Sequence, residues 1–271
     1  MERTIFYISD GTGITAETLG HTLLTQFPDT TFQSVTLPFV NTPEKVDRTI
    51  RRINDCAEEE GKTPLIFSTL TDPNLRSQLS RCKGKVFDFF ATFTTPMEQA
   101  LEIKSFPVAG RSHGMGNPSN YLNRIDAVHY ALQHDDGVSP RDYSQADIII
   151  TGVSRTGKTP TCLYLALQFG IQAANYPLTD DDFEKGNLPE PLRLERSKLF
   201  GLTVEAERLH QIRRERRPNS LYASMKQVLK ELKAAENLFM REGIPFLNIT
   251  HMSIEEIAAS VMQQASLKRR I

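Results

Sequence analysis

Residues 1–90 alternate between short apolar runs and longer stretches in which apolar residues recur every three or four positions. Short β-branched runs are typical of buried strands, and the longer spacing is typical of helices that bury one face. The pattern predicts strands at residues 4–8, 32–39, 64–68 and 86–90, and helices at 14–26, at 43–60 and from residue 72. This alternation predicts a mostly parallel sheet covered by helices, which is an α/β fold.

The second half of the chain repeats the alternation of strands and helices. Its apolar runs predict strands at residues 147–151, 173–177, 198–204 and 246–249, and helices at 121–134, 205–217 and 221–241. A further helix ends at Gly170, and the last one opens at Ser253. We therefore expect an N-terminal, mostly parallel α/β domain over residues 1–143 and a C-terminal P-loop kinase-like α/β domain over residues 144–271.

Residues 152–159 fit the phosphate-binding pattern G-x-x-x-x-G-K-[ST]. In this pattern backbone N–H groups surround phosphate oxygens, the lysine places a charge on the terminal phosphates, and the threonine hydroxyl ligates Mg²⁺. The loop follows an apolar strand and precedes an apolar helix, which is the required context. The alternative is a Gly-rich turn that binds nothing. We predict that Lys158 is catalytic and that Thr159 ligates the metal. The residues predicted to bind the nucleotide are Gly152, Val153, Ser154, Arg155, Thr156, Gly157, Lys158 and Thr159.

An acidic cluster at residues 179–182 follows the strand predicted at 173–177. Phosphoryl transfer to a hydroxyl group uses acidic side chains near Mg²⁺ and near the attacking oxygen. We assign the catalytic role to Asp181, and Asp180 is the neighbouring candidate. The alternative is a plain helix N-terminus, where the helix dipole favours aspartate.

Three other polar segments each allow two interpretations. Arg111 and His113 lie in a Gly-rich loop and are candidates for binding phosphate or, for His113, for catalytic proton transfer; the alternative is a pair of solvated side chains. The turn at residues 10–13 either holds an anion or is a tight turn in which Asp10 caps a helix. The arginine-rich stretch at 205–217 is either a solvated helix face or a lid over the phosphoryl group.

Composition narrows the class of protein further. The 271 residues include 32 lysines and arginines against 33 aspartates and glutamates, which argues against a general nucleic-acid or membrane-surface binder. The three cysteines are widely spaced, as expected for free thiols in a reducing cytoplasm. No apolar run approaches the ~20 residues that a membrane span needs. We therefore expect a cytoplasmic protein, with a homodimer as the default assembly.

Six segments, in order along the whole chain, carry a resemblance to a known family. They lie at residues 6–12, 134–137, 152–161, 174–177, 200–203 and 253–256. In these segments the chain resembles the bacterial phosphoenolpyruvate synthase regulatory proteins, which are related to the pyruvate, phosphate dikinase regulatory proteins of bacteria and plants. The extended run around the phosphate-binding pattern is more specific than the pattern alone and shows no departure from the family.

The resemblance implies two opposing activities. Family members inactivate phosphoenolpyruvate synthase by phosphorylating a threonine, with ADP as donor and AMP as product, and they reactivate it with inorganic phosphate, releasing pyrophosphate. The target threonine lies beside a catalytic histidine of the synthase that must itself be phosphorylated. The resemblance also implies that residues 152–159 hold ADP with Mg²⁺, that Lys158 stabilises the transferring phosphoryl group, and that His113 and Arg111 meet phosphate or phosphothreonine.

The sequence leaves two other functions open. A non-catalytic nucleotide sensor would change shape with ADP and bind a partner without turnover. An ordinary ATP-dependent kinase would phosphorylate a small molecule and need no protein substrate. Nucleotide preference distinguishes both from an ADP-dependent protein kinase.

Overall fold

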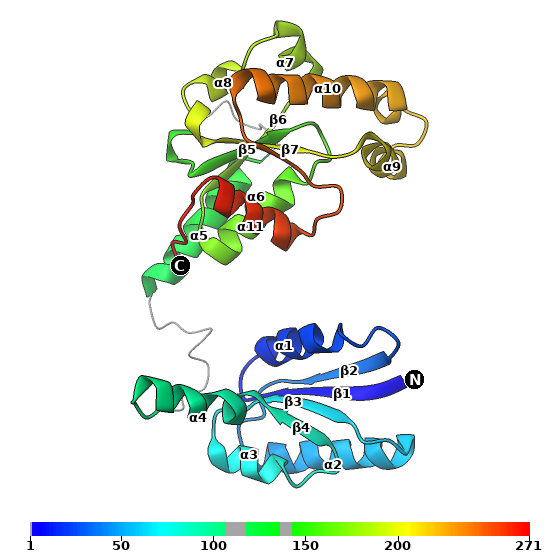
Figure 1. Cartoon of the computed structure of the whole chain (residues 1–271), viewed down its shortest axis with the longest axis vertical. Coiled ribbons are helices and arrows are strands. Elements are labelled where there is room, and N and C mark those ends of the chain that lie inside the picture. Colours follow the sequence, from blue (N-terminus) through cyan, green and yellow to red (C-terminus); the bar gives the residue numbers. More distant parts are fainter. Residues whose placement is uncertain (1, 107–117, 136–142) are drawn as a thin grey trace. The chain divides into compact units, whose positions relative to one another are not determined.

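The computed structural model describes residues 2–106, 118–135 and 143–271. The chain forms two compact units, Met1–Gly116 and Asn117–Ile271, which are described one at a time (Figure 1). Each unit is built on a four-stranded parallel sheet with helices, so the predicted α/β fold class is confirmed. Within the described part of the chain, every helix is too short or too polar to cross a lipid bilayer.

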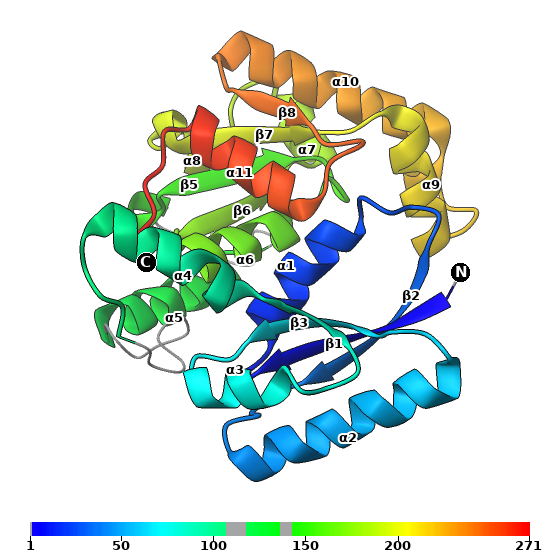
Figure 2. The ribbon, with the colours of Figure 1, turned by 60° about the horizontal axis from the view of Figure 1, so that its bottom comes forward.

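The sheet of the first unit has the strand order β2-β1-β3-β4. Its elements are β1 (Glu2–Ser9), α1 (Ile14–Leu24), β2 (Thr31–Leu37), α2 (Pro43–Glu60), β3 (Leu65–Thr69), α3 (Pro73–Leu79), β4 (Lys85–Asp88) and α4 (Phe89–Leu101). Successive side chains of a strand point to opposite faces of the sheet. Helix α1 lies on one face of this sheet, and α2 and α3 lie on the other (Figure 2). Tyr7 of β1 therefore packs with residues of α1, whereas Phe6 and Ile8 pack with residues of α2 and α3.

The fourth strand is shorter than the apolar run 86–90 predicted. β4 ends at Asp88, whose side chain accepts a hydrogen bond from the backbone N–H of Ala91 at 2.9 Å and so caps α4. Phe89 and Phe90, expected in the strand, instead begin this helix. Aspartate is among the preferred N-cap residues, and here the cap outweighs the β propensity of the two phenylalanines.

The sheet of the second unit has the order β6-β5-β7-β8, with β5 (Ile148–Gly152), β6 (Ala173–Pro177), β7 (Leu199–Thr203) and β8 (Phe246–Asn248). One face is covered by α5 (Pro118–Gln133), α6 (Lys158–Phe169) and α11 (Ile254–Gln264) (Figure 1). The other face is covered by the short helices α7 (Asp180–Lys185) and α8 (Glu190–Arg193) together with α9 (Ala206–Arg216) and α10 (Met225–Glu242). The four strands predicted in this half all form.

Helix α5 belongs to the second unit. Its buried Ala127 and Ala131 pack in one core with Ile148 of β5 and Leu165 of α6. The sequence pattern predicted a domain boundary at residue 143, with this helix in the N-terminal domain. The small residues on α5 let it approach α6 closely, and this packing groups it with the second sheet instead.

Gly20 lies where α1 approaches the first sheet. An added Cβ would lie 2.6 Å from Cε1 of Tyr7 and 2.8 Å from ring atoms of Phe67. We expect Gly20→Ala to lower the unfolding free energy by about 1–3 kcal/mol, because the overpacking cost outweighs the gain in helix propensity. Urea denaturation followed by circular dichroism measures the change. The exposed neighbour provides a control, since His21→Ala should change stability by less than about 0.5 kcal/mol; equal effects of the two variants would contradict the prediction.

Candidate functional site

Residues 152–159 form a loop between the buried strand β5 and helix α6. Arg155 and Gly157 have left-handed backbone conformations, with φ of 77° and 68°. Gly152 has φ of 151°, and an added Cβ there would lie 2.4 Å from the carbonyl oxygen of Leu202. The loop therefore has the strand–loop–helix context that the sequence predicted. It lies at the carboxyl end of a parallel sheet, where ligands of α/β proteins bind.

Lys158 and Thr156 point into the loop. Nζ of Lys158 and Oγ1 of Thr156 both donate hydrogen bonds to the carbonyl oxygen of Val153, each at 2.9 Å. Only 5 % of Lys158 is exposed, so its charge is held against the loop and away from solvent. A positive charge beside the backbone N–H groups of a helix N-terminus favours an anionic ligand.

The hydroxyl group of Thr159 connects α6 to the residues after α5 and to β6. Oγ1 of Thr159 donates to Oδ1 of Asp135 at 2.8 Å and accepts from Nδ2 of Asn175 at 3.1 Å. Nδ2 of Asn175 also donates to Oδ1 of Asp135 at 2.6 Å. Asn175 is fully buried in β6, so it holds the other two side chains from the core of the sheet.

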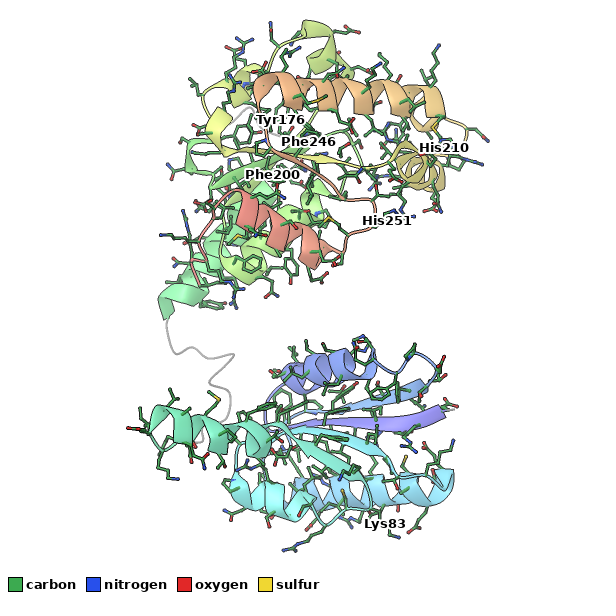
Figure 3. The ribbon with its side chains drawn as sticks, viewed as in Figure 1. Lys83, Tyr176, Phe200, His210, Phe246 and His251 are labelled. Atoms are coloured by element: carbon green, nitrogen blue, oxygen red, sulfur yellow. The ribbon has the colours of Figure 1, made fainter. Side chains whose placement is uncertain are left out.

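Arg213 is a fully buried arginine on α9, the helix marked by His210 in Figure 3. Its Nη2 donates to the carbonyl oxygen of Ser154 at 3.1 Å and to Oε2 of Glu231 on α10 at 2.7 Å. The guanidinium carbon lies 4.3 Å from the ring centroid of Tyr222, and the hydroxyl of Tyr222 lies 2.9 Å from Oγ of Ser154. Arg213 therefore ties the loop to α9, to α10 and to the short 3-10 helix η4 (Leu221–Ala223).

The acidic cluster forms the N-terminus of α7. Asp182 caps this helix together with Thr179 and accepts a hydrogen bond from the hydroxyl of Tyr176 at 3.2 Å. Asp180 accepts from Gln227 at 2.8 Å and pairs with Lys230 at 3.1 Å. Asp181 is exposed and makes no side-chain hydrogen bond or ion pair with the described residues. Asp182 therefore acts as a cap of α7, and Asp180 is a first-turn residue bound to α10, whereas the catalytic assignment of Asp181 stays a prediction.

Cys162 is a buried thiol on the same helix as Lys158. Burial raises its pKa strongly, and the negative charge of Asp135 raises it further. Sγ donates to the carbonyl oxygen of Ala174 at 3.4 Å. A thiol held in the protonated form is a poor nucleophile, so Cys162 has a packing role in the core of the second unit.

The other predicted site segments lie elsewhere. Arg111 and His113 fall outside the described residues. Asp10 accepts hydrogen bonds from the backbone N–H of Thr71 at 2.7 Å and from the Thr71 hydroxyl at 2.5 Å, so it joins the ends of β1 and β3. The expectation that Asp10 caps the following helix is wrong, because the N-cap position of α1 is Gly13.

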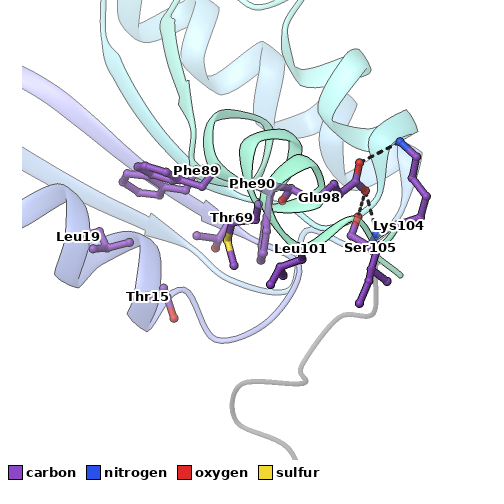
Figure 4. A pocket seen from close by; sticks show the side chains of 13 residues that line it. Thr15, Leu19, Thr69, Phe89, Phe90, Glu98, Leu101, Lys104 and Ser105 are labelled. Atoms are coloured by element: carbon purple, nitrogen blue, oxygen red, sulfur yellow. Dashed lines mark hydrogen bonds and ion pairs between the residues drawn. The ribbon is translucent and has the colours of Figure 1, made fainter.

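The first unit also has an apolar cavity of about 470 Å³ between α1 and α4 (Figure 4). Its large apolar lining residues are Leu19, Phe89, Phe90, Phe93, Met97, Leu101 and Ile103. At its rim, hydrogen bonds from Ser105 and an ion pair with Lys104 lower the pKa of Glu98 to about 2. None of the predicted site residues that the structure describes lines this cavity.

Sequence patterns did not assign Asp135 or Asn175 to the site, and they left Arg213 as one of several solvated or lid arginines. Arg213 follows the buried Leu209 by one helical turn, so helical spacing was a usable signal that it faces inward. Asn175 is a polar residue in the middle of an apolar strand, which is a weaker signal for a special role. Asp135 has no local signal for contact with Thr159, since the two residues are 24 positions apart in the sequence.

A parallel sheet whose strand β5 runs into a lysine- and threonine-bearing loop defines an α/β protein suited to a phosphate-bearing ligand. The family model described as kinase/pyrophosphorylase matches residues 5–262. The chain therefore belongs to the kinase/pyrophosphorylase family and is a phosphotransferase. This confirms the resemblance seen in the sequence.

Similar proteins from three bacteria carry the same name, "Putative phosphoenolpyruvate synthase regulatory protein". The protein from Halorhodospira halophila is 54% identical over 270 residues, covering 99% of this chain and 98% of the relative. The protein from Legionella pneumophila is 50% identical over 271 residues, covering 100% of both chains. The protein from Pseudomonas aeruginosa is 50% identical over 270 residues, covering 100% of this chain and 98% of the relative.

Proposed function

We propose that this protein is a bifunctional regulator of phosphoenolpyruvate synthase. In one direction it is an ADP-dependent kinase that phosphorylates a threonine of the synthase and inactivates it. In the other direction it is a phosphate-dependent pyrophosphorylase that removes the phosphoryl group and restores activity. The observation that carries this proposal is the 152–159 loop with its enclosed Lys158, in a chain of the kinase/pyrophosphorylase family whose relatives are named for the synthase.

The loop is the proposed binding site for the ADP phosphates. Backbone N–H groups of residues 152–159 and the N-terminus of α6 supply donors and a positive dipole. Nε of Arg155 is a buried donor with no hydrogen-bond partner among the described residues, and a phosphate oxygen is the acceptor that suits it. In this proposal Lys158 moves its hydrogen bond from the carbonyl of Val153 to the terminal phosphate.

The oxygen atoms around Thr159 fit Mg²⁺. This ion prefers hydroxyl, carboxylate and phosphate oxygens, and the hydroxyl of Thr159 lies beside the carboxylate of Asp135. When bound, Mg²⁺ neutralises negative charge on the phosphates of the nucleotide. We propose Thr159 as a protein ligand of the ion.

The two proposed reactions use the same phosphoryl group. In the kinase direction the hydroxyl oxygen of the target threonine forms a bond to the β-phosphorus of ADP, and the bond from that phosphorus to the bridging oxygen breaks. AMP leaves with the bridging oxygen, and the hydroxyl proton passes to a base. In the reverse direction an oxygen of inorganic phosphate attacks the phosphorus of phosphothreonine, so pyrophosphate forms and the threonine oxygen regains a proton. Lys158 stabilises charge on the phosphoryl group in both directions.

We propose Asp181 as the residue that accepts the threonine proton or assists the metal, and His113 with Arg111 as the residues that meet phosphate or phosphothreonine. Asp181 is exposed at the start of α7, the helix that follows β6, so a protein substrate can approach it. The three free cysteines are consistent with a cytoplasmic protein, and phosphoenolpyruvate synthase is the proposed protein substrate.

ADP labelled on its β-phosphate tests the proposal. The protein is incubated with labelled ADP and with phosphoenolpyruvate synthase that carries a phosphoryl group on its catalytic histidine. We expect label on a synthase threonine as AMP appears, and labelled pyrophosphate once inorganic phosphate is added. Transfer from ATP alone would indicate an ordinary kinase. Binding of ADP without any transfer would indicate a nucleotide sensor.

A further inference from the structure

We propose that Asp135, and not the acidic cluster at the start of α7, is the carboxylate that partners Thr159 in binding Mg²⁺ with the nucleotide. The inference rests on the proposed function, because it concerns the metal that accompanies ADP. It assigns a role to a residue outside the phosphate-binding loop, on the segment that follows α5.

The carboxylate of Asp135 lies directly beside the hydroxyl group of Thr159. Oδ1 of Asp135 lies 2.8 Å from the hydroxyl oxygen of Thr159, the residue that the loop offers to the metal. The same oxygen accepts from Nδ2 of the fully buried Asn175 at 2.6 Å. Carboxylate and threonine hydroxyl oxygens are both ligands that Mg²⁺ prefers.

Contacts of the preceding residue, His134, hold the backbone at Asp135 in place. The backbone N–H of Asn175 donates to the carbonyl oxygen of His134 at 2.9 Å, which fixes the residue before Asp135 against β6. The ring of His134 stacks on Tyr130 with 4.0 Å between centroids, so the end of α5 is packed as well. The segment that carries Asp135 is therefore held both against β6 and by the packed end of α5. A preorganised ligand site requires such support.

The negative charge of Asp135 also favours it as the partner of the metal ion. Among the described residues, no lysine, arginine or histidine forms an ion pair with Asp135. Two other carboxylates near the site are already engaged, since Glu231 pairs with Arg213 and Asp180 with Lys230. A half-buried carboxylate without a protein cation is the more attractive partner for a divalent ion.

Calorimetric titration of the whole chain with ADP tests the inference without measuring activity. Each protein is titrated once with Mg²⁺ present and once with a chelator. In the wild type we expect Mg²⁺ to increase the affinity for ADP. Asp135→Asn keeps a hydrogen-bond acceptor for Thr159 but removes the charge, and we expect it to weaken Mg²⁺ binding by about 10–100-fold and so to remove most of this increase. Binding of ADP in the chelator should be retained.

Asp126→Asn is the matched control, because it removes the same charge from an exposed position of α5, and it should keep the full effect of Mg²⁺. Asp181→Asn tests the competing assignment of the metal to the acidic cluster. A full Mg²⁺ effect in Asp135→Asn, or its loss only in Asp181→Asn, would overturn the inference. Absence of ADP binding in the wild type would instead refute the proposed function. If Asp135→Asn lacks a native circular dichroism spectrum, Asp135→Glu replaces it. That variant shifts the carboxylate by one methylene. The inference would then be overturned if the Mg²⁺ concentration that gives half of the increase in ADP affinity were the same as in the wild type.

Discussion

Lys158→Met is expected to lower the rate of phosphoryl transfer to the synthase by at least about 10²–10³-fold. In the proposed reaction the ammonium group stabilises charge on the phosphoryl group in the transition state, and methionine has a similar length but no charge. Lys158 is enclosed by the loop and bonded to Val153, and it is the only buried lysine among the described residues. Single-turnover transfer from β-labelled ADP to the synthase measures the loss.

Lys233→Met provides the control for this experiment. Lys233 is exposed on α10, so the same chemical change there should leave transfer within about twofold of the wild type. Circular dichroism of Lys158→Met should match that of the wild type, which separates a loss of chemistry from a loss of fold. Wild-type transfer rates in Lys158→Met would show that the 152–159 loop is not where the phosphoryl group is transferred.

Arg213→Met is expected to lower the unfolding free energy of the second unit by about 3–5 kcal/mol. Arg213 is fully buried, and its ion pair with Glu231 at 2.7 Å is almost enclosed. Removing the guanidinium group leaves the carboxylate of Glu231 in the interior without its cation and leaves the carbonyl of Ser154 without a donor. Urea denaturation followed by circular dichroism measures the change.

Two further variants test whether the loss of stability comes from the buried ion pair. Arg214→Met removes the same charge from the exposed neighbour and should change stability by less than about 0.5 kcal/mol. Replacing both partners, Arg213→Met with Glu231→Met, should recover much of the loss, because an apolar pair avoids the unpaired buried charge. If Arg213→Met were as mild as Arg214→Met, the buried ion pair would not be contributing to the stability of this unit.

The ends of several elements were set by capping contacts that the hydrophobic pattern does not record. The pattern predicted a helix from residue 221, yet α10 begins at Met225, because Ser224 accepts a hydrogen bond from the backbone N–H of Gln227 at 3.3 Å. Asp88 likewise ended β4 before the apolar run was complete. Side-chain caps act over three residues, and periodicity is averaged over a longer window, so the existence of an element was easier to predict than its ends.

The core of the candidate site could be predicted only in part. Residues 152–159 were found from the sequence, because a Gly-rich loop between an apolar strand and an apolar helix is a local pattern. Arg213 was first interpreted as one of several solvated or lid arginines, and the structure instead buries it against Ser154, a residue 59 positions away. The spacing from Leu209 indicates that Arg213 faces inward, but its contacts with Ser154 and Glu231 depend on how α9 packs in the tertiary structure.

The sequence by itself determined the parallel α/β architecture, the strand–loop–helix context and the positions of Lys158 and Thr159, because these depend on short-range periodicity and backbone conformation. Only the tertiary structure decided which carboxylate meets Thr159. Asp135 and Asn175 come from separate elements, and they converge because α5 packs on α6 and β6 pairs directly with β5. Such a contact depends on strand order and helix packing, which no local pattern around Asp135 encodes.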